Sequence, residues 1–367
     1  MHLSGTARLP LHGGKAPPWL FRRMVELAKV TSEALVLERG KKEFLRRLSN
    51  PYWFQAYSCV LGFDWHSSGT TTVTCGALKE ALDKIDIGIV TAGGKGKASR
   101  NTQDEIMSAA DRFSLNDMKI DNLSYASRMT AKVDNSCVQD GYNLYHHSFF
   151  VSEDGSWAVV QQGMNGGTRY ARRYHWLSSY SKKFVVEPHE GIAAMKKEDS
   201  VLDMTSKDSA KVQDICVDMA KEKPERIRRC FSGKGQQRLF EFTEEHLDMP
   251  QHHPVLDTDI SSAGWKALKT AYEVQPKDYE ELVSLEGMGP KTIRALALVS
   301  SLIYGDEPSW RDPAKYSFAH GGKDGYPYPV DCRQMEKSSE IIKNAIECSR
   351  MGDRSKAGAL ARLGRVF

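Results

Sequence analysis

The residues whose types and spacing most clearly suggest chemistry lie at positions 285–292, with the sequence LEGMGPKT. Two glycines at alternate positions allow a tight turn, and the proline after them suits the first turn of a following helix. The free N–H groups at that helix start, with a lysine and a threonine beside them, form a site for a phosphate. An ordinary glycine-capped junction between helices is the alternative. The residues expected to bind a nucleic-acid backbone are Gly287, Gly289, Lys291 and Thr292.

The same segment resembles the helix–hairpin–helix of the DNA repair glycosylases that share a Gly/Pro-rich loop and an aspartate. In the lyase-active members a lysine occupies the position of Lys291, and the catalytic aspartate lies in a loop that Tyr-Pro-Val-Asp331 resembles. The resemblance implies that the lysine amine attacks the sugar C1′ and forms a Schiff base. Here 40 residues separate Lys291 from Asp331, a longer interval than in that family. We therefore expect Lys291 mainly to anchor DNA, with lyase chemistry as the alternative.

Two polar clusters in the N-terminal half are further candidates. GFDWHSSG places Asp64 close to His66, and such a pair can bind a metal ion or share a proton; a hydrogen-bonded loop is the interpretation we favour. GGKGKASR carries Lys95, Lys97 and Arg100 among glycines. It lacks the GxxxxGK[ST] order of a nucleotide-binding loop. We expect a flexible basic loop on DNA phosphate, or an exposed loop without a ligand.

Two later clusters combine charges with other functional groups. KVDNSCVQDGYNLYHH brings two carboxylates and two imidazoles near a strand, which suggests a metal-dependent nuclease site, although helix-end and surface positions are the alternative. The candidate catalytic residues of this cluster are Asp134 and Asp140, with His146 and His147 beside them. ARRYHW interleaves Arg172 and Arg173 with aromatic residues. That composition suits phosphate contact and base stacking, and an amphipathic helix is the equal alternative.

Elements predicted from hydrophobic periodicity must position these residues. Helical spacing predicts two helices in 19–48 that Gly40 separates, and the turn at Asp154-Gly155 predicts a β-hairpin. The predicted fold class is α+β: a mixed N-terminal domain with a small sheet, followed by a mainly helical domain. The expected boundaries are a mixed domain at 1–200, a helical connector at 201–254, a helix–hairpin–helix domain at 255–348 and a basic tail at 349–367.

Composition narrows the class of protein. The chain of 367 residues has 51 basic and 47 acidic side chains, so nucleic-acid affinity must come from local patches. Its 7 cysteines are scattered, which favours reduced thiols over zinc fingers or a disulfide scaffold. No signal-peptide stretch or membrane span is visible, so we expect a cytoplasmic protein with no membrane partner. The sequence requires no cofactor, and a divalent metal would serve only the nuclease alternative.

The whole chain also resembles one family. Its motifs include LHGGKAPPWL, GFDWHSSGTTT, WAVVQQGMN, EPHEGI and SFAHGGKDGYPYPVD. Together they are similar to an uncharacterised archaeal and bacterial family catalogued as a domain of unknown function, over residues 1–347. The resemblance implies that the polar clusters are family motifs. We expect a DNA-binding protein of repair type that acts on DNA as a glycosylase/lyase or as a nuclease, a hydrolase. The alternatives are a non-enzymatic scaffold of the repair or recombination machinery, and RNA as the partner.

Overall fold

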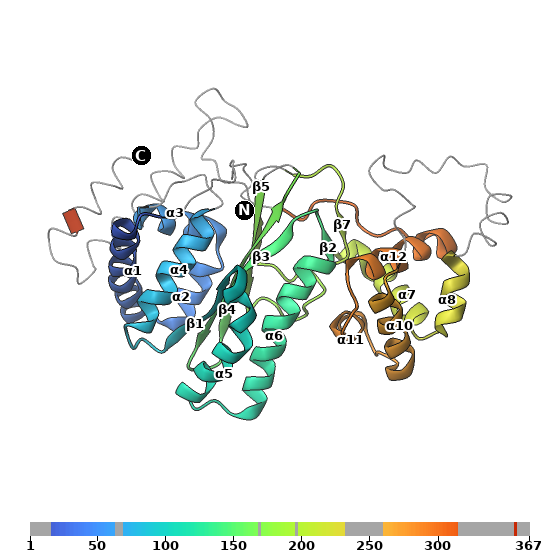
Figure 1. The fold of residues 1–367 in the computed structure, drawn as a ribbon, viewed down its shortest axis with the longest axis horizontal. Coiled ribbons are helices and arrows are strands. Elements are labelled where there is room, and N and C mark those ends of the chain that lie inside the picture. Colours follow the sequence, from blue (N-terminus) through green and yellow to red (C-terminus); the bar gives the residue numbers. More distant parts are fainter. Residues whose placement is uncertain are drawn as a thin grey trace, which may run out of the picture.

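The structure is a computed structural model, and its described residues are 16–62, 69–167, 170–194, 197–231, 260–314 and 356–357. A central sheet lies between two groups of helices, and a third group of helices lies beyond the second (Figure 1). The predicted fold class, α+β, is confirmed. None of the described helices is both long enough and apolar enough to cross a bilayer.

The central sheet is antiparallel, and its described strands follow the order β1-β3-β4-β5-β6. The strands are β1 (Ile89–Lys95), β3 (Asn143–Ser152), β4 (Trp157–Asn165), β5 (Tyr170–Leu177) and β6 (Gly191–Ala193). A separate pairing joins β2 (Val138–Gln139) to β7 (Leu202–Asp203). The predicted β-hairpin is confirmed, because β3 and β4 pair around Gly155. Gly155 has a φ of 87°, which glycine adopts at little cost.

Four helices cover one face of the sheet. They are α1 (Pro18–Arg39), α2 (Lys41–Leu48), α3 (Pro51–Val60) and α4 (Gly69–Asp83). The predicted division of the first two helices at Gly40 is confirmed, and Gly40 has a φ of 84°. The apolar core on this face includes Phe44, Phe54 and Phe150.

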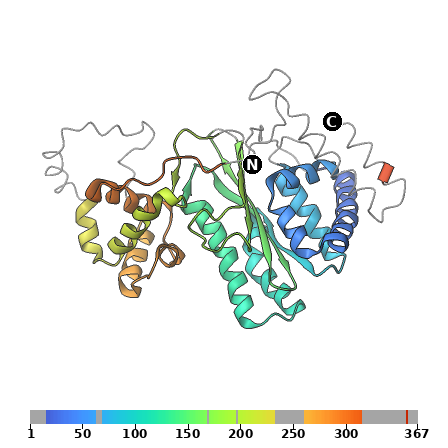
Figure 2. The ribbon, with the colours of Figure 1, turned by 180° about the vertical axis from the view of Figure 1, so that it is seen from behind.

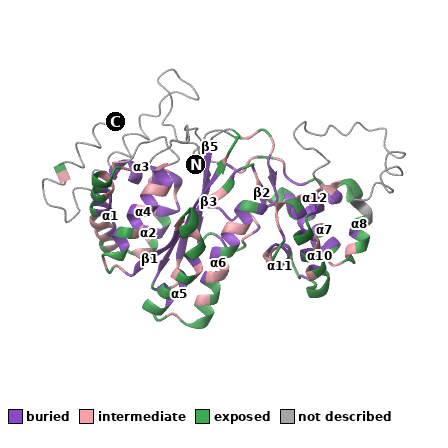
Figure 3. Ribbon diagram, in the orientation of Figure 1, coloured by how far each residue is buried: buried purple, intermediate pink, exposed green. Residues whose placement is uncertain are grey.

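The opposite face is covered by two helices that follow β1. A short 3₁₀ helix, η1 (Gly96–Asn101), leads into α5 (Thr102–Arg112) and α6 (Asp117–Ser136). Phe149 and Trp176 belong to the core on this side. Because successive strand residues point to opposite faces, Phe149 packs on this side and Phe150 on the other. The sheet is therefore largely buried on both faces, and most of each strand is purple in Figure 3.

The C-terminal helices pack beside α6, as Figure 2 shows from behind. They are preceded by η2 (Lys207–Ser209) and comprise α7 (Ala210–Ala220), α8 (Pro224–Phe231), α10 (Ser262–Val274), α11 (Tyr279–Ser284) and α12 (Pro290–Tyr304). Helix α7, which falls in the expected connector, packs against α11 and α12 of the expected C-terminal domain. One hydrophobic core continues from the sheet through α6 to α12. These packed surfaces hold the C-terminal helices against the sheet.

Candidate functional site

The connection between α11 and α12, residues 285–292, forms a tight turn that we call the α11–α12 turn. Its Met288 N–H donates to the Leu285 carbonyl at 3.2 Å, and Gly287 has a φ of 80°. A turn with this φ at its third residue favours glycine. Helix α12 then starts at Pro290 with no side-chain cap and no acidic residue in its first turn. The first turn of α12 thus presents its N–H groups without a side-chain cap from the N-cap residue.

Contacts with α6, α10 and β2 fix the shape of the α11–α12 turn. Met288 is fully buried, and a Cβ on Gly287 would lie 2.9 Å from the Ala263 carbonyl oxygen. The Lys132 ammonium on α6 donates to the Leu285 carbonyl, and the Gln139 amide donates to the Pro290 carbonyl at 2.8 Å. The turn therefore has a fixed shape before any ligand arrives.

The residues of this turn that the sequence predicts to bind phosphate differ in their exposure to solvent. Gly287 and Lys291 are exposed, and Gly289 is half-buried. Thr292 is only 2% exposed, and its hydroxyl lies where a Cβ on Gly264 of α10 would be. The expectation that the Thr292 hydroxyl binds phosphate is therefore wrong, because that side chain packs between α10 and α12.

The glycine-rich basic segment forms the end of a strand and a 3₁₀ helix rather than the loop that the sequence predicted. Lys95 ends β1, and the next residues form η1. The Glu105 carboxylate fixes the segment by accepting from the Gly93 N–H at 2.6 Å and from Lys79 at 2.7 Å. The side chains predicted to bind DNA here, which are Lys95, Lys97 and Arg100, are all exposed.

Arg172 and Arg173 lie in strand β5 rather than in an amphipathic helix, and both are fully buried. Arg173 points toward the α1–α4 side, where it donates to the Gln55 side chain at 2.9 Å and lies over the Phe54 ring. The expectation that these two arginines contact DNA phosphate is therefore wrong. The mixed composition of ARRYHW does not indicate that this segment is a strand with both faces buried.

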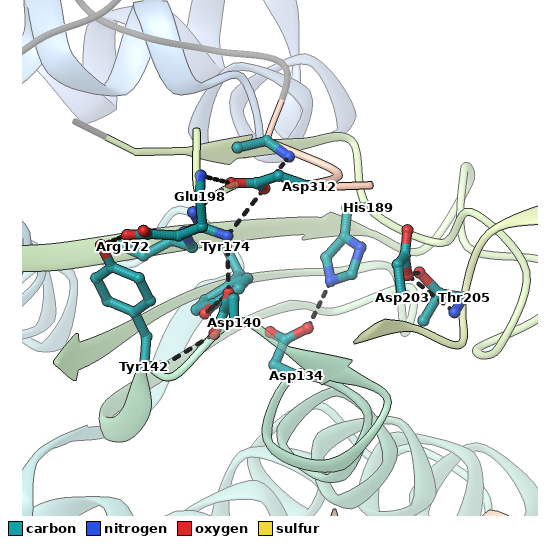
Figure 4. Close-up of polar contacts among 11 residues, drawn as sticks. Asp134, Asp140, Tyr142, Arg172, Tyr174, His189, Glu198, Asp203, Thr205 and Asp312 are labelled. Atoms are coloured by element: carbon teal, nitrogen blue, oxygen red, sulfur yellow. Dashed lines mark hydrogen bonds and ion pairs between the residues drawn. The ribbon is translucent and has the colours of Figure 1, made fainter. Parts of the chain in front are cut away.

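Arg172 instead holds two carboxylates together in the interior (Figure 4). Its guanidinium lies 3.0 Å from Asp140 and 2.7 Å from Asp312. Asp140 also accepts from the Tyr174 hydroxyl at 2.7 Å. Burial lowers the pKa of Arg172, but the two carboxylates outweigh burial and raise that pKa above its usual value. This ion-pair cluster fastens the segment after α12 to the sheet.

Asp134 on α6 is the centre of a second buried cluster (Figure 4). Its carboxylate lies 2.5 Å from His189 Nε2, and it accepts from the Gln161 amide at 2.5 Å and from the Trp176 indole at 3.0 Å. His189 also lines a cavity of about 170 Å³ with Asp203 and Asp312. Nearby Glu187 has a φ of 41°, a strained value for a residue other than glycine.

The predicted metal-binding role of Asp134 and Asp140 is not supported by this arrangement. The oxygens of both carboxylates already accept hydrogen bonds from nitrogen and hydroxyl donors. Among the described residues, no group of three or more His, Cys, Asp or Glu side chains could hold a metal ion. The two carboxylates therefore act as anchors for cationic and polar partners.

A larger cavity, of about 240 Å³, lies between α6, β3 and η1, and we call it the Ser127 cavity. Its lining includes Ser127, Arg128, His147 and Gln161. The Ser127 Oγ lies 3.0 Å from His147 Nε2, and His147 Nδ1 lies 2.7 Å from the Gln161 side-chain oxygen. Burial lowers the pKa of His147 to about 4. His147 is thus a neutral imidazole at neutral pH.

His146 does not share that hydrogen-bond chain with its neighbour. Its Nε2 lies 3.0 Å from the hydroxyl of Ser148, two residues along the same strand. Burial, with smaller contributions from His147 and Lys95, lowers the pKa of His146 to about 3. The two adjacent histidines therefore serve different faces of the sheet.

Three predicted site residues, Asp64, His66 and Asp331, lie outside the described residues. The pairing of Lys291 with Asp331 therefore stays a prediction. The residues that sequence reasoning did not single out as a site are Ser127, His189 and Asp312. Of these, only His189 fell in a recognised motif, EPHEGI.

The fold is an antiparallel sheet with polar clusters buried against its faces and an uncapped helix start exposed beside it. The chain belongs to the family described as a protein of unknown function, DUF763, whose model matches residues 5–330. No curated protein and no solved structure matches the chain. The family match includes both cavities and the α11–α12 turn.

Proposed function

We propose that this protein binds DNA as an enzyme of DNA repair type, and that the α11–α12 turn is a helix–hairpin–helix that binds backbone phosphate. The observation that carries the proposal is the uncapped start of α12 beside the exposed Lys291. A helix start concentrates free N–H groups and the positive end of the helix dipole, which together favour an anion. The ammonium of Lys291 adds a full positive charge at the same place.

A second set of cations extends this surface along α6. Lys132 contacts the turn from α6, and Arg128 lies four residues earlier on the same helix. Four residues of α-helix span about 6 Å. Arg128 lines the Ser127 cavity next to η1, which carries the exposed Lys97 and Arg100. A nucleic-acid backbone held at the turn would therefore meet further positive charge along its path.

Duplex DNA binding by the full chain tests the proposal. Lys291→Glu should lower the affinity by about tenfold or more at about 0.1 M salt, because it places a negative charge at the phosphate. Lys269→Glu, an exposed charge reversal on α10, is the matched control and should change the affinity little. Glu286→Gln removes the negative charge of an exposed residue in the turn, so it should strengthen DNA binding. This variant tests the electrostatic contribution of the turn independently of Lys291.

Two results would contradict the proposal. One is failure of the wild-type chain to bind duplex DNA at low salt. The other is equal loss in the Lys291→Glu and Lys269→Glu variants. Competition with a duplex RNA of the same sequence separates the partners, and a preference for RNA would assign RNA instead of DNA.

Lyase chemistry at Lys291 is the second candidate, favoured by the exposed position of this lysine in the α11–α12 turn. Borohydride should then trap a covalent complex with DNA that contains an abasic site, and Lys291→Ala should abolish the complex. Binding without trapping would leave Lys291 as an anchor. Binding without any product would indicate a scaffold of the repair or recombination machinery.

We also place the protein in the cytoplasm. Three of its cysteines, Cys75, Cys137 and Cys216, are buried thiols that form no disulfide bond. Burial raises the pKa of Cys75 and of Cys137 to about 12, so both remain protonated thiols. Buried thiols without a disulfide bond fit a reducing compartment.

A further inference from the structure

We propose that Ser127 is a nucleophile, that His147 is its general base, and that the Ser127 cavity takes a phosphodiester of a nucleic-acid backbone. The nucleic-acid part rests on the proposed function. The pairing of Ser127 with His147 does not, because it follows from hydrogen bonds inside the sheet and α6.

The direction of each hydrogen bond follows from Asp134. A buried carboxylate that accepts from Trp176 and lies next to His189 acts only as an acceptor. The Gln161 amide nitrogen must therefore face Asp134, and the Gln161 oxygen must face His147. Asp134 therefore orients the Gln161 amide, whose oxygen contacts the His147 imidazole.

The orientation of Gln161 then fixes the tautomer of His147. An amide oxygen only accepts, so His147 Nδ1 carries the proton and donates to it. The neutral ring leaves Nε2 as an acceptor, 3.0 Å from the Ser127 hydroxyl. Ser127 must donate its proton to that nitrogen. Ser127, His147 and Gln161 thus form a hydrogen-bonded chain of a nucleophile, a base and an orienting group. Such a chain activates serine in acyl- and phosphoryl-transfer sites.

The charges around the Ser127 cavity favour an anionic substrate. Arg128 lines the cavity, is exposed, and has no ion-pair partner among the described residues. Ser99 of η1 also lines it, between Lys97 and Arg100. A phosphodiester carries the single negative charge that such a set can neutralise as the reaction proceeds.

The position of the cavity relative to the α11–α12 turn favours a backbone over a small phosphate ester. Arg128 at the cavity and Lys132 at the turn lie four residues apart on α6, about 6 Å along its axis. Phosphates along one strand of a duplex rise by about 3.4 Å each, so that separation corresponds to roughly two nucleotides. A strand held at the turn can thus place a nearby phosphate at the cavity.

The reaction balances with these residues and water. Ser127 Oγ attacks phosphorus and its proton passes to His147 Nε2; the Oγ–P bond forms, the P–O bond to the leaving nucleoside breaks, and the proton goes to the leaving oxygen. Water then attacks the phosphoserine, His147 takes one water proton and returns it to Ser127 Oγ, and the Oγ–P bond breaks. The products are an alcohol and a phosphomonoester.

Labelling with diisopropyl fluorophosphate, a reagent that phosphorylates activated serines, tests the proposal on the full chain. Peptide mass spectrometry should find one modified serine, Ser127, with loss of fluoride. Ser127→Ala should remove the label, and Ser124→Ala, one turn earlier on the same helix, should leave it unchanged. His147→Gln should slow labelling by about a hundredfold or more, as expected for loss of a general base.

Label on other serines only, or equal labelling rates in folded His147→Gln and wild-type protein, would overturn the proposal. If His147→Gln does not fold, Ser127→Cys replaces it: iodoacetamide should then modify Cys at 127 faster than any of the four buried native thiols. If iodoacetamide does not modify Cys at 127 faster than those native thiols, the proposal is also overturned. Failure here is distinct from failure of the proposed function, because the labelling needs no DNA and duplex DNA binding by the wild-type chain is measured separately.

Discussion

The α11–α12 turn and the polar clusters of the sheet are two different ways of building a site. The turn uses eight consecutive residues, is partly exposed, and takes its shape from glycine, proline and a buried methionine. The clusters use residues from α6, three strands and the segment after α12, and they are buried. A site made of backbone can therefore be recognised in a short sequence, whereas a site made of distant side chains cannot.

The two regions should also fail in different ways. A buried polar cluster is stable only while each charge keeps its partner, so removal of one member leaves the others unsatisfied in the interior. The turn loses its shape when a side chain is added to its backbone, and it loses its charge when Lys291 is changed. Substitutions in the two regions, and a change of pH, therefore separate these two kinds of dependence.

Arg172→Leu should be the most damaging change to the sheet. It removes the cation between Asp140 and Asp312, and leaves two buried carboxylates without their counter-charge. Loss of one partner of a buried ion pair costs about 3–5 kcal/mol, measured as the free energy of unfolding in urea. Arg311→Leu, on the same C-terminal segment but exposed, should change it by less than about 0.5 kcal/mol. Equal losses of unfolding free energy in the two variants would show that the buried ion pairs of Arg172 do not stabilise the sheet.

Acid should destabilise the sheet through its buried histidines. Burial lowers the folded-state pKa of His147 from 6.5 to about 4, so between these pH values only the unfolded chain binds the proton. Stability therefore falls as pH drops from about 6.5 to about 4, by about 3 kcal/mol for this residue. In a folded His147→Gln variant, unfolding free energy measured across this range should depend less steeply on pH. An unchanged slope would show that His147 is not held neutral.

Gly287→Ala should distort the α11–α12 turn. The new methyl group meets the Ala263 carbonyl oxygen and the residue keeps a positive φ, so we expect a loss of about 2 kcal/mol in unfolding free energy and weaker DNA binding. Gly305→Ala is the matched control, because Gly305 also has a positive φ but open space around it. It should cost about 1 kcal/mol and leave DNA binding unchanged. Similar DNA affinities for both variants would contradict the role of the turn.

Lys291→Ala should have the smallest effect on the fold and a specific effect on binding. The side chain is exposed, so unfolding free energy should change by less than about 0.5 kcal/mol. The slope of log affinity against log salt should fall by about 1, the value for one phosphate contact. A slope equal to that of the wild type would show that Lys291 does not touch phosphate.

Local features of the fold could be predicted from the sequence, and long-range ones could not. The β3–β4 hairpin, the helix division at Gly40 and the turn at Gly287 each depend on neighbouring residues. Strand β5 was missed because Arg172 and Arg173 point to opposite buried faces, so no polar–apolar alternation marks the strand. One ion-pair partner of Arg172 is also distant in the sequence, since 140 residues separate Arg172 from Asp312.

The candidate sites follow the same rule. Lys291 could be singled out because glycine, proline and lysine stand together, but the burial of Thr292 depends on Gly264 of another helix. Ser127 could not be singled out, since it becomes distinctive only beside His147 and Gln161, which are brought to it by strand pairing. Asp134 was recognised as a functional candidate, although for a metal rather than for the amide and imidazole it orients.

Amide hydrogen exchange of the full chain, with and without duplex DNA, tests the central claim most directly. We expect slower exchange on DNA binding at the N–H groups of Gly287, Gly289 and Lys291, because phosphate would accept hydrogen bonds from the uncapped start of α12. Protection should weaken with salt. DNA binding with unchanged exchange over residues 285–292 would contradict the claim and move the nucleic-acid site elsewhere on the protein.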